Sequence, residues 1–208
     1  QLPDFAGTNF GTQRTDSDKP VVRGPSQRGE RATHVETGGS KFISNKLDFD
    51  AVQTGVTIFG ISATSDSSSG YERLVAIMNE AESDPTPEIV LNRDIDENFK
   101  VAFRADDNQR NAEAGKSTPV FAFCAKFDPA SNEIRMVNHN KSGSTNTSAQ
   151  PLGFSTSATL SDVRLFAEYR QSGEYNFWNG ETSEIGIIEG PVSDAEQDQI
   201  VEALKEKL

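Results

Sequence analysis

Residues 119–127 read Pro-Val-Phe-Ala-Phe-Cys-Ala-Lys-Phe, and this stretch decides the fold class. Three phenylalanines fall on one side of an extended chain, because successive side chains of a β-strand point to opposite faces. The other side carries valine, alanine and cysteine, so both faces are apolar over most of the length. A strand of this kind belongs near the centre of a sheet that is covered on both sides.

Short apolar runs continue in both directions from this strand, separated by clusters of Ser, Asp, Asn, Gly and Pro. The run Phe99–Arg104 alternates large apolar and mostly polar side chains, which predicts a half-buried strand. Two long polar stretches, Asp106–Ser117 and Lys141–Gln150, are expected to be turns or loops. Further strands are expected at Gly55–Ala63, Glu72–Met78, Glu88–Asn92, Glu133–Asn138, Val163–Tyr169 and Glu184–Glu189. The pattern predicts an all-β fold, a two-sheet antiparallel sandwich.

One helix is expected, at the C-terminal end of the sequence. Ser193 with Glu196 three residues later forms a capping-box pattern. Ile200, Leu204 and Leu208 then recur at four-residue spacing, which gives one apolar face. A short amphipathic helix should therefore pack back onto the sandwich.

The segment Glu184–Glu189, followed by Pro191–Glu196 and this helix, resembles the closing segment of concanavalin A-like, laminin G-like domains. Pro119–Asn138 resembles a hairpin of the same family, although His139 stands where the family usually has glycine. The resemblance covers residues 31–208. It implies a jelly-roll β-sandwich and, most often, carbohydrate recognition, adhesion or a structural role.

Residues 1–30 are read as an extended, glycine-rich arm that precedes this domain, because their glycines and polar residues interrupt any periodicity. In an assembly, such an arm would lie on a neighbouring subunit and become ordered there.

The charge of the chain restricts its partners. Its 208 residues include 20 Lys and Arg against 32 Asp and Glu, which gives a formal net charge of -12. Binding to nucleic acid or to an anionic membrane surface is not expected from such a balance. No apolar run approaches the ~18 residues needed to cross a bilayer, so membrane insertion is not expected. The single cysteine, Cys124, lies in a central apolar run and is expected to be a small buried hydrophobe.

Enzyme motifs are sparse, so we expect a non-catalytic protein. The sequence has two histidines and none of the common hydrolase, phosphate-binding or zinc-protease motifs. Glycoside hydrolases of this fold need paired carboxylates on one inner strand, and no predicted strand carries them. Glu168–Asn176 resembles a strand of alginate-type polysaccharide lyases, but the Gln-(Ile/Val)-His motif of those enzymes is missing. A lyase or glycoside hydrolase is therefore the less favoured alternative.

The candidate ligand-binding residues are Arg170, Tyr175, Asn176 and Trp178. An aromatic face can stack on the C–H face of a sugar ring, while Asn and Arg fix its hydroxyls. The alternative is that Phe177 and Trp178 close the end of the sandwich, which leaves Tyr175 as the exposed ring.

Asp94 and Asp96 are candidate calcium ligands, because alternating carboxylates supply the hard oxygen donors that calcium prefers. The alternative is a solvated acidic turn between two strands. No other cofactor is expected.

Two functional classes remain open. The first is a lectin-like module for carbohydrate binding or adhesion on a secreted protein, cell surface or virus particle. The second is a structural or decorating subunit of a virion or surface assembly, with a homo-oligomer or neighbouring subunits as partners. Both predict a location that is extracellular, at the cell surface or on a virion surface.

Overall fold

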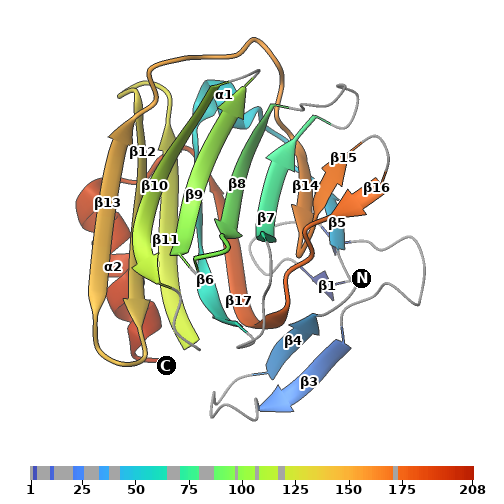
Figure 1. Cartoon of the computed structure of the whole chain (residues 1–208), viewed down its shortest axis with the longest axis vertical. Helices are drawn as coiled ribbons and strands as arrows, with labels where there is room; N and C mark the ends of the chain where they lie inside the picture. Colours follow the sequence, from blue (N-terminus) through green and yellow to red (C-terminus); the bar gives the residue numbers. More distant parts are fainter. Residues whose placement is uncertain are drawn as a thin grey trace.

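The computed structural model describes residues 2–3, 10–11, 21–25, 33–37, 43–64, 71–79, 87–96, 98–105, 108–116, 120–170 and 173–208. Within this part of the chain, two large antiparallel sheets are stacked as two layers, and one helix lies on the outside of the second layer (Figure 1). The predicted all-β sandwich with a C-terminal helix is therefore confirmed.

The first layer is a six-stranded sheet in the order β10-β9-β8-β7-β14-β5. Its strands are β5 (Ile43–Lys46), β7 (Glu72–Met78), β8 (Glu88–Arg93), β9 (Asn98–Ala105), β10 (Asn108–Lys116) and β14 (Asp162–Leu165).

The second layer is a seven-stranded sheet in the order β13-β12-β11-β6-β17-β4-β3. A strand from the end of the sequence, β17, thus lies between β6 and β4. The edge strand β3 falls within the segment that the sequence assigns to an extended arm. The strands are β3 (Val21–Pro25), β4 (Thr33–Thr37), β6 (Val56–Thr64), β11 (Val120–Asp128), β12 (Glu133–Asn140), β13 (Thr145–Pro151) and β17 (Gly180–Glu189).

Smaller elements complete the described part of the chain. Two short hairpins pair β1 (Leu2–Pro3) with β2 (Phe10–Gly11) and β15 (Glu168–Arg170) with β16 (Gly173–Tyr175). A one-turn helix, α1 (Ala51–Thr54), begins at Asp50, whose side chain accepts a hydrogen bond from the backbone N–H of Val52.

The core between the two sheets is aromatic at its centre. Phe99 of the first sheet lies 4.7 Å from Phe121 and 5.3 Å from Phe123 of the second, measured between ring centroids. Trp178 joins this group at 6.1 Å from Phe99, and all four side chains are fully buried. The alternation in residues 119–127 therefore has the predicted consequence, because the phenylalanine side of β11 faces the opposite sheet.

The outer face of β11 is covered by the second helix, α2 (Asp194–Lys205). Val201 packs against Cys124, and Leu204 packs in a neighbouring cluster that contains Ala122. Burial raises the pKa of the Cys124 thiol to about 12. Among the described residues, no helix is long and apolar enough to cross a membrane.

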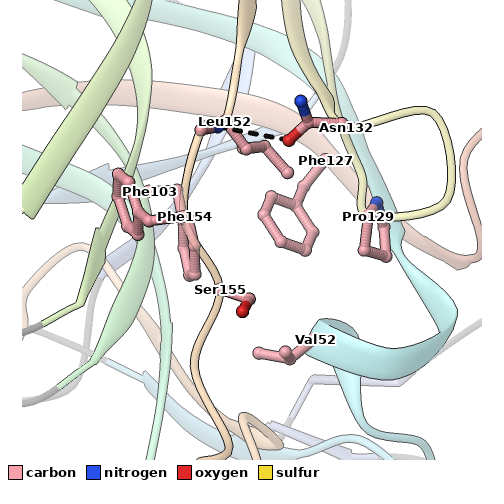
Figure 2. A pocket seen from close by; sticks show the side chains of 9 residues that line it. Val52, Phe103, Phe127, Pro129, Asn132, Leu152, Phe154 and Ser155 are labelled. Carbon is pink, nitrogen blue, oxygen red and sulfur yellow. Dashed lines mark hydrogen bonds between the residues drawn. The ribbon is translucent and has the colours of Figure 1, made fainter.

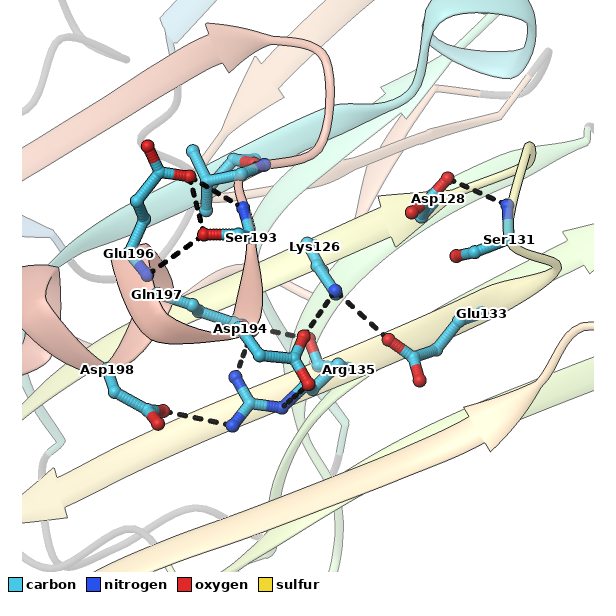
Figure 3. Close-up of polar contacts among 12 residues, drawn as sticks. Lys126, Asp128, Ser131, Glu133, Arg135, Ser193, Asp194, Glu196, Gln197 and Asp198 are labelled. Carbon is cyan, nitrogen blue, oxygen red and sulfur yellow. Dashed lines mark hydrogen bonds and ion pairs between the residues drawn. The ribbon is translucent and has the colours of Figure 1, made fainter.

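The first turn of α2 is fixed to the sheet by polar contacts (Figure 3). Lys126 of β11, which is nearly buried, contacts Asp194 at 2.5 Å and Glu133 at 3.1 Å. Arg135 of β12 donates to Asp198 at 2.9 Å. Buried Gln197 donates to the backbone carbonyl of Cys124 at 2.7 Å. These contacts set the direction in which the helix crosses the sheet.

The predicted capping box at the start of α2 is present. The backbone N–H of Glu196 donates to the Ser193 hydroxyl at 3.3 Å, and the Glu196 carboxylate accepts from the Ser193 backbone N–H at 2.8 Å. Two N–H groups that would otherwise lack partners are thus satisfied.

Four predictions of strands and loops differ from the structure. The expected loops at 106–117 and 141–150 contain the edge strands β10 and β13. The strand expected at Glu133–Asn138 continues to Asn140. The strand expected at 163–169 is divided at Phe166, whose φ of 72° is left-handed and interrupts an extended chain.

Candidate functional site

The segment Asn176–Trp178, expected to present aromatic side chains, is held tightly by the sheets. The Asn176 carbonyl accepts a hydrogen bond from the backbone N–H of Arg73 at 2.7 Å, and the Trp178 N–H donates to the Phe166 carbonyl at 2.9 Å. Trp178 is 0% exposed. Its ring therefore belongs to the aromatic core and has no exposed surface that a ligand could contact. This agrees with the alternative interpretation of the sequence, in which Trp178 closes the end of the sandwich.

Arg170 and Tyr175 lie on the hairpin β15–β16, where Glu168 pairs with Tyr175 and Arg170 with Gly173. The side chains of these two candidate residues lie outside the described part of the structure. A sugar platform at Tyr175 stays a prediction.

Asp94 and Asp96 lie in the turn between β8 and β9. The Asp94 carboxylate accepts from the backbone N–H of Asp96 and Asn98 and from Lys100 Nζ, the last at 2.9 Å. Burial raises the pKa of Asp94, but these hydrogen bonds and the Lys100 charge outweigh it and hold the pKa below its usual value. Asp94 thus stabilises its own turn, and within the described ranges no group of three or more His, Cys, Asp or Glu side chains is placed to hold a metal ion.

A cluster of polar side chains lies on the outer face of the six-stranded sheet. Strand register places Arg73, Asn92 and Lys100 beside one another on β7, β8 and β9. Arg164 of β14 lies on the same face, opposite Ala76. All four of these polar residues are buried. The cluster is closed to solvent, so it is not an open binding site.

Glu72 and Arg93 form a buried pair at one end of β7 and β8, with Arg93 Nη1 and Glu72 Oε2 3.8 Å apart. Burial raises the pKa of Glu72 to about 7, although Arg93 and a hydrogen bond from the Asn179 backbone act in the opposite direction. A raised carboxyl pKa is common at catalytic sites, but structural ion pairs also produce it. Glu72 does not line the open pocket described next, so we assign it to the fold.

An open pocket of about 380 Å³ lies at the end of the sandwich that carries α1 (Figure 2). Four separate parts of the sequence meet there: α1, strand β9, the β11–β12 turn and the segment that follows β13. Its lining is mainly apolar, with an amide and a hydroxyl among the side chains. The lining residues are Val52, Phe103, Phe127, Pro129, Asn132, Leu152, Gly153, Phe154 and Ser155.

Phe154 forms one wall of the pocket. Its ring is half-buried and stacks on Phe103, with centroids 5.0 Å apart and planes 10° apart. Figure 2 shows Phe154 between Phe103 and the rest of the lining. One face of Phe154 is thus covered by Phe103, and the ring also lines the pocket.

The polar rim of the pocket is built by Asn132 and the chain after β13. The Asn132 side-chain oxygen accepts from the Gly153 N–H at 3.2 Å, and its backbone carbonyl accepts from the Leu152 N–H at 3.0 Å. Asn132 and Gly153 have φ values of 57° and 72°, which asparagine and glycine tolerate better than other residues. Ser155 is exposed beside Phe154. These groups offer polar atoms next to an aromatic wall.

Arg110 of the edge strand β10 lies beside this rim. Its guanidinium carbon is 6.0 Å from the centre of the Phe154 ring. Its Nη2 atom lies 3.6 Å from the position that a Cβ on Gly153 would occupy.

Sequence reasoning missed this pocket. Phe154 follows a stretch that reads as a polar loop, and its partner Phe103 is 51 positions earlier in the chain. The one feature of the sequence that could have indicated the pocket is Phe154 itself, a large aromatic residue in an otherwise polar segment, directly after Gly153.

Solved structures with similar folds include phage and sialidase proteins. The enzymatically active domain of tailspike protein 2 from bacteriophage CBA120 matches 95% of this chain with a TM-score of 0.64 and 13% identity, and the chain spans 30% of it. The CBM40 of the Ruminococcus gnavus IT-sialidase, bound to α2,3-sialyllactose, matches 75% of this chain and is itself 92% covered, with a TM-score of 0.58 and 12% identity.

The leech intramolecular trans-sialidase matches 83% of this chain with a TM-score of 0.60 and 17% identity, and 27% of that enzyme is covered. No protein-family model and no curated protein sequence matches the chain. At these identities the likeness shows a shared β-sandwich fold, and the laminin G-like family that the sequence resembles is not confirmed.

Proposed function

We propose that this chain is a non-catalytic carbohydrate-binding module and that its saccharide occupies the pocket beside Phe154. The observation that carries the proposal is the pocket itself, an open hollow in which one aromatic face stands next to amide, hydroxyl and backbone groups. Its volume of about 380 Å³ lies in the range of small-molecule sites, ~300–1,000 Å³.

The chemistry of the lining fits a sugar ring. The C–H face of a pyranose is apolar and packs on an aromatic ring, while its edge carries hydroxyls. Phe154 supplies the ring, and Asn132 and Ser155 supply hydrogen-bonding groups at the rim. The backing of Phe154 by Phe103 keeps the ring in place, so a ligand loses little free energy in ordering it.

The lining also supports binding without catalysis. Glycoside hydrolysis needs two carboxyl groups separated by roughly 5 to 9.5 Å across the scissile bond. Among the residues that line this pocket, none is Asp, Glu or His. The likeness in fold to a CBM40 bound to α2,3-sialyllactose also supports binding without catalysis.

The purified protein is first screened on a glycan array, with and without calcium. The best ligand is then titrated into the parent protein and into Phe154→Leu, and the two affinities are compared. Leucine fills the space but has no aromatic face, so affinity should fall roughly three- to tenfold. Ile188→Ala, at a side chain on β17 that is 39% exposed, is the matched control and should bind like the parent. An unchanged affinity in Phe154→Leu with an unchanged melting temperature would exclude this pocket.

A second role, as part of a virion or surface assembly, is favoured by one observation. The tailspike domain matches 95% of this chain, more than the sialidase modules do. In this alternative the protein acts outside the cell on a particle surface, and neighbouring copies are its partners. Mass measurement in solution separates the two: a monomer that binds glycans supports the module, and a trimer or ring that binds none supports the assembly.

A further inference from the structure

Arg110, at the rim of the pocket, bears on which class of ligand the pocket can bind. Arg110 is exposed on the edge strand β10, and its Nη1 donates to the Gln109 backbone carbonyl at 3.2 Å. A guanidinium has five N–H donors, so most of its hydrogen-bonding capacity remains open. Among the described residues, no carboxylate lies within ion-pairing distance of Arg110.

Other arginines of the chain do have such partners. Arg104 contacts Glu88 at 2.8 Å, and Arg135 contacts Asp198 at 2.9 Å. The chain has 12 more acidic than basic residues, so partners for an arginine are abundant. Among the described arginines, Arg110 thus differs from Arg104 and Arg135 in lying beside a pocket and meeting no carboxylate.

The surroundings of the pocket contain little that would repel an anion. Its lining has no acidic side chain. Two carboxylates near the lining accept hydrogen bonds within their own turns. Asp128 accepts from the backbone N–H groups of Ala130 and Ser131 at 3.1 Å, and Asp50 accepts from that of Val52 at 3.1 Å. Exposed charges more than ~8 Å away are largely screened at physiological ionic strength, so distant acidic residues have little effect on an anion held beside Arg110.

We propose that the ligand of this pocket is an acidic saccharide, whose ring stacks on Phe154 while its carboxylate pairs with Arg110. This inference rests on the proposed carbohydrate-binding function and narrows it to a class of sugar. A guanidinium matches a carboxylate with two parallel hydrogen bonds. Gly153 has no side chain, and Arg110 Nη2 lies 3.6 Å from the position that its Cβ would occupy, so the guanidinium stands next to the lining of the pocket.

The test compares acidic sugars with neutral counterparts. Oligogalacturonate is titrated beside its methyl ester, and 3′-sialyllactose beside lactose, by calorimetry at low and at physiological salt. The wild-type protein should prefer one acidic sugar over its neutral counterpart roughly fivefold or more at low salt, and less as salt is added. Arg110→Gln should remove this preference and retain the weaker binding of the neutral sugar. Arg104→Gln, on the same sheet and paired with Glu88, is the matched control and should keep the preference.

The outcomes separate the two proposals. Equal binding of acidic and neutral sugars, sensitive to Phe154→Leu and insensitive to Arg110→Gln, overturns the acidic ligand and leaves the carbohydrate-binding function standing. Binding of neutral glycans alone likewise overturns the acidic ligand and leaves the carbohydrate-binding function standing. A protein that binds no glycan on the array and no sugar in calorimetry overturns both.

Discussion

Phe123 is fully buried between the two sheets and lies 5.3 Å from Phe99 and 6.1 Å from Phe121. Replacing it by alanine leaves a cavity that rigid strands cannot close, so Phe123→Ala should lower the free energy of unfolding by about 3 to 5 kcal/mol. Denaturant titration measures this. The control is Ile95→Ala, because Ile95 is 59% exposed in the β8–β9 turn and its loss should change little. Equal effects of the two substitutions would mean that the core has been placed incorrectly.

Glu72 gives the fold a dependence on pH. Its pKa is raised from 4.5 to about 7 in the folded protein, chiefly by burial, so the folded state holds a proton that the unfolded state has released. The contribution of Glu72 is therefore full below about pH 4.5 and is lost as the pH rises to about 7. Stability measured at pH 5 and pH 7 should fall less in Glu72→Gln than in the parent. Identical pH profiles for the two proteins would contradict this account.

Position 60 requires a glycine for a reason that the sequence alone does not reveal. A Cβ at this position on β6 would lie 2.2 Å from the Glu184 carbonyl oxygen of the neighbouring strand β17. The register between these strands shifts between Thr182 and Glu184, next to this close approach. Only the paired structure explains why a glycine interrupts an otherwise apolar strand.

Among the secondary-structure elements, the N-terminal cap of α2 can be tested by a single substitution. Ser193→Ala removes the hydroxyl that accepts from the Glu196 N–H and should cost about 1 kcal/mol of stability. Ser193→Thr retains an acceptor and serves as the control. Thermal melts of both variants give the comparison, and an unchanged melting temperature in Ser193→Ala would show that the cap contributes nothing to the fold.

The sequence predicts elements well where burial is strong. Strand β7 has the limits expected from its apolar run, Glu72–Met78, and all of its residues are buried. The edge strands β10 and β13 escaped prediction for a physical reason. β10 contributes small alanines to the core, and β13 is mostly exposed and pairs only with β12. Strands of this kind are held by their neighbours and carry a weak apolar pattern of their own.

The candidate site was less predictable than the fold. The pocket joins residues between positions 52 and 155, and no local pattern relates Val52 to Phe154. The aromatic segment that did attract attention, at Phe177 and Trp178, contributes Trp178 to the core. Large aromatic rings mark both cores and binding sites, and burial, which only the fold determines, separates the two.

For the molecule as a whole, β17 is the strand that closes the second sheet. A chain shortened to residues 1–190 loses α2 and keeps every strand, so it should fold with lower stability and bind a hydrophobic dye at the face left by Val201 and Leu204. A chain shortened to residues 1–179 also loses β17 and should show no cooperative thermal transition. Circular dichroism melts distinguish them, and a cooperative melt of the shorter chain would show that β17 is dispensable.

The position of β17 has a consequence for biosynthesis. Strands β4 and β6 are separated in the finished sheet by a strand made more than a hundred residues after them. While the chain is being synthesised, one edge of β6 therefore has no hydrogen-bonding partner until residues 180–189 have left the ribosome. An open apolar edge of this kind invites pairing with other nascent chains. Translation speed and the supply of chaperones should thus affect the yield of folded protein more strongly than its final stability suggests.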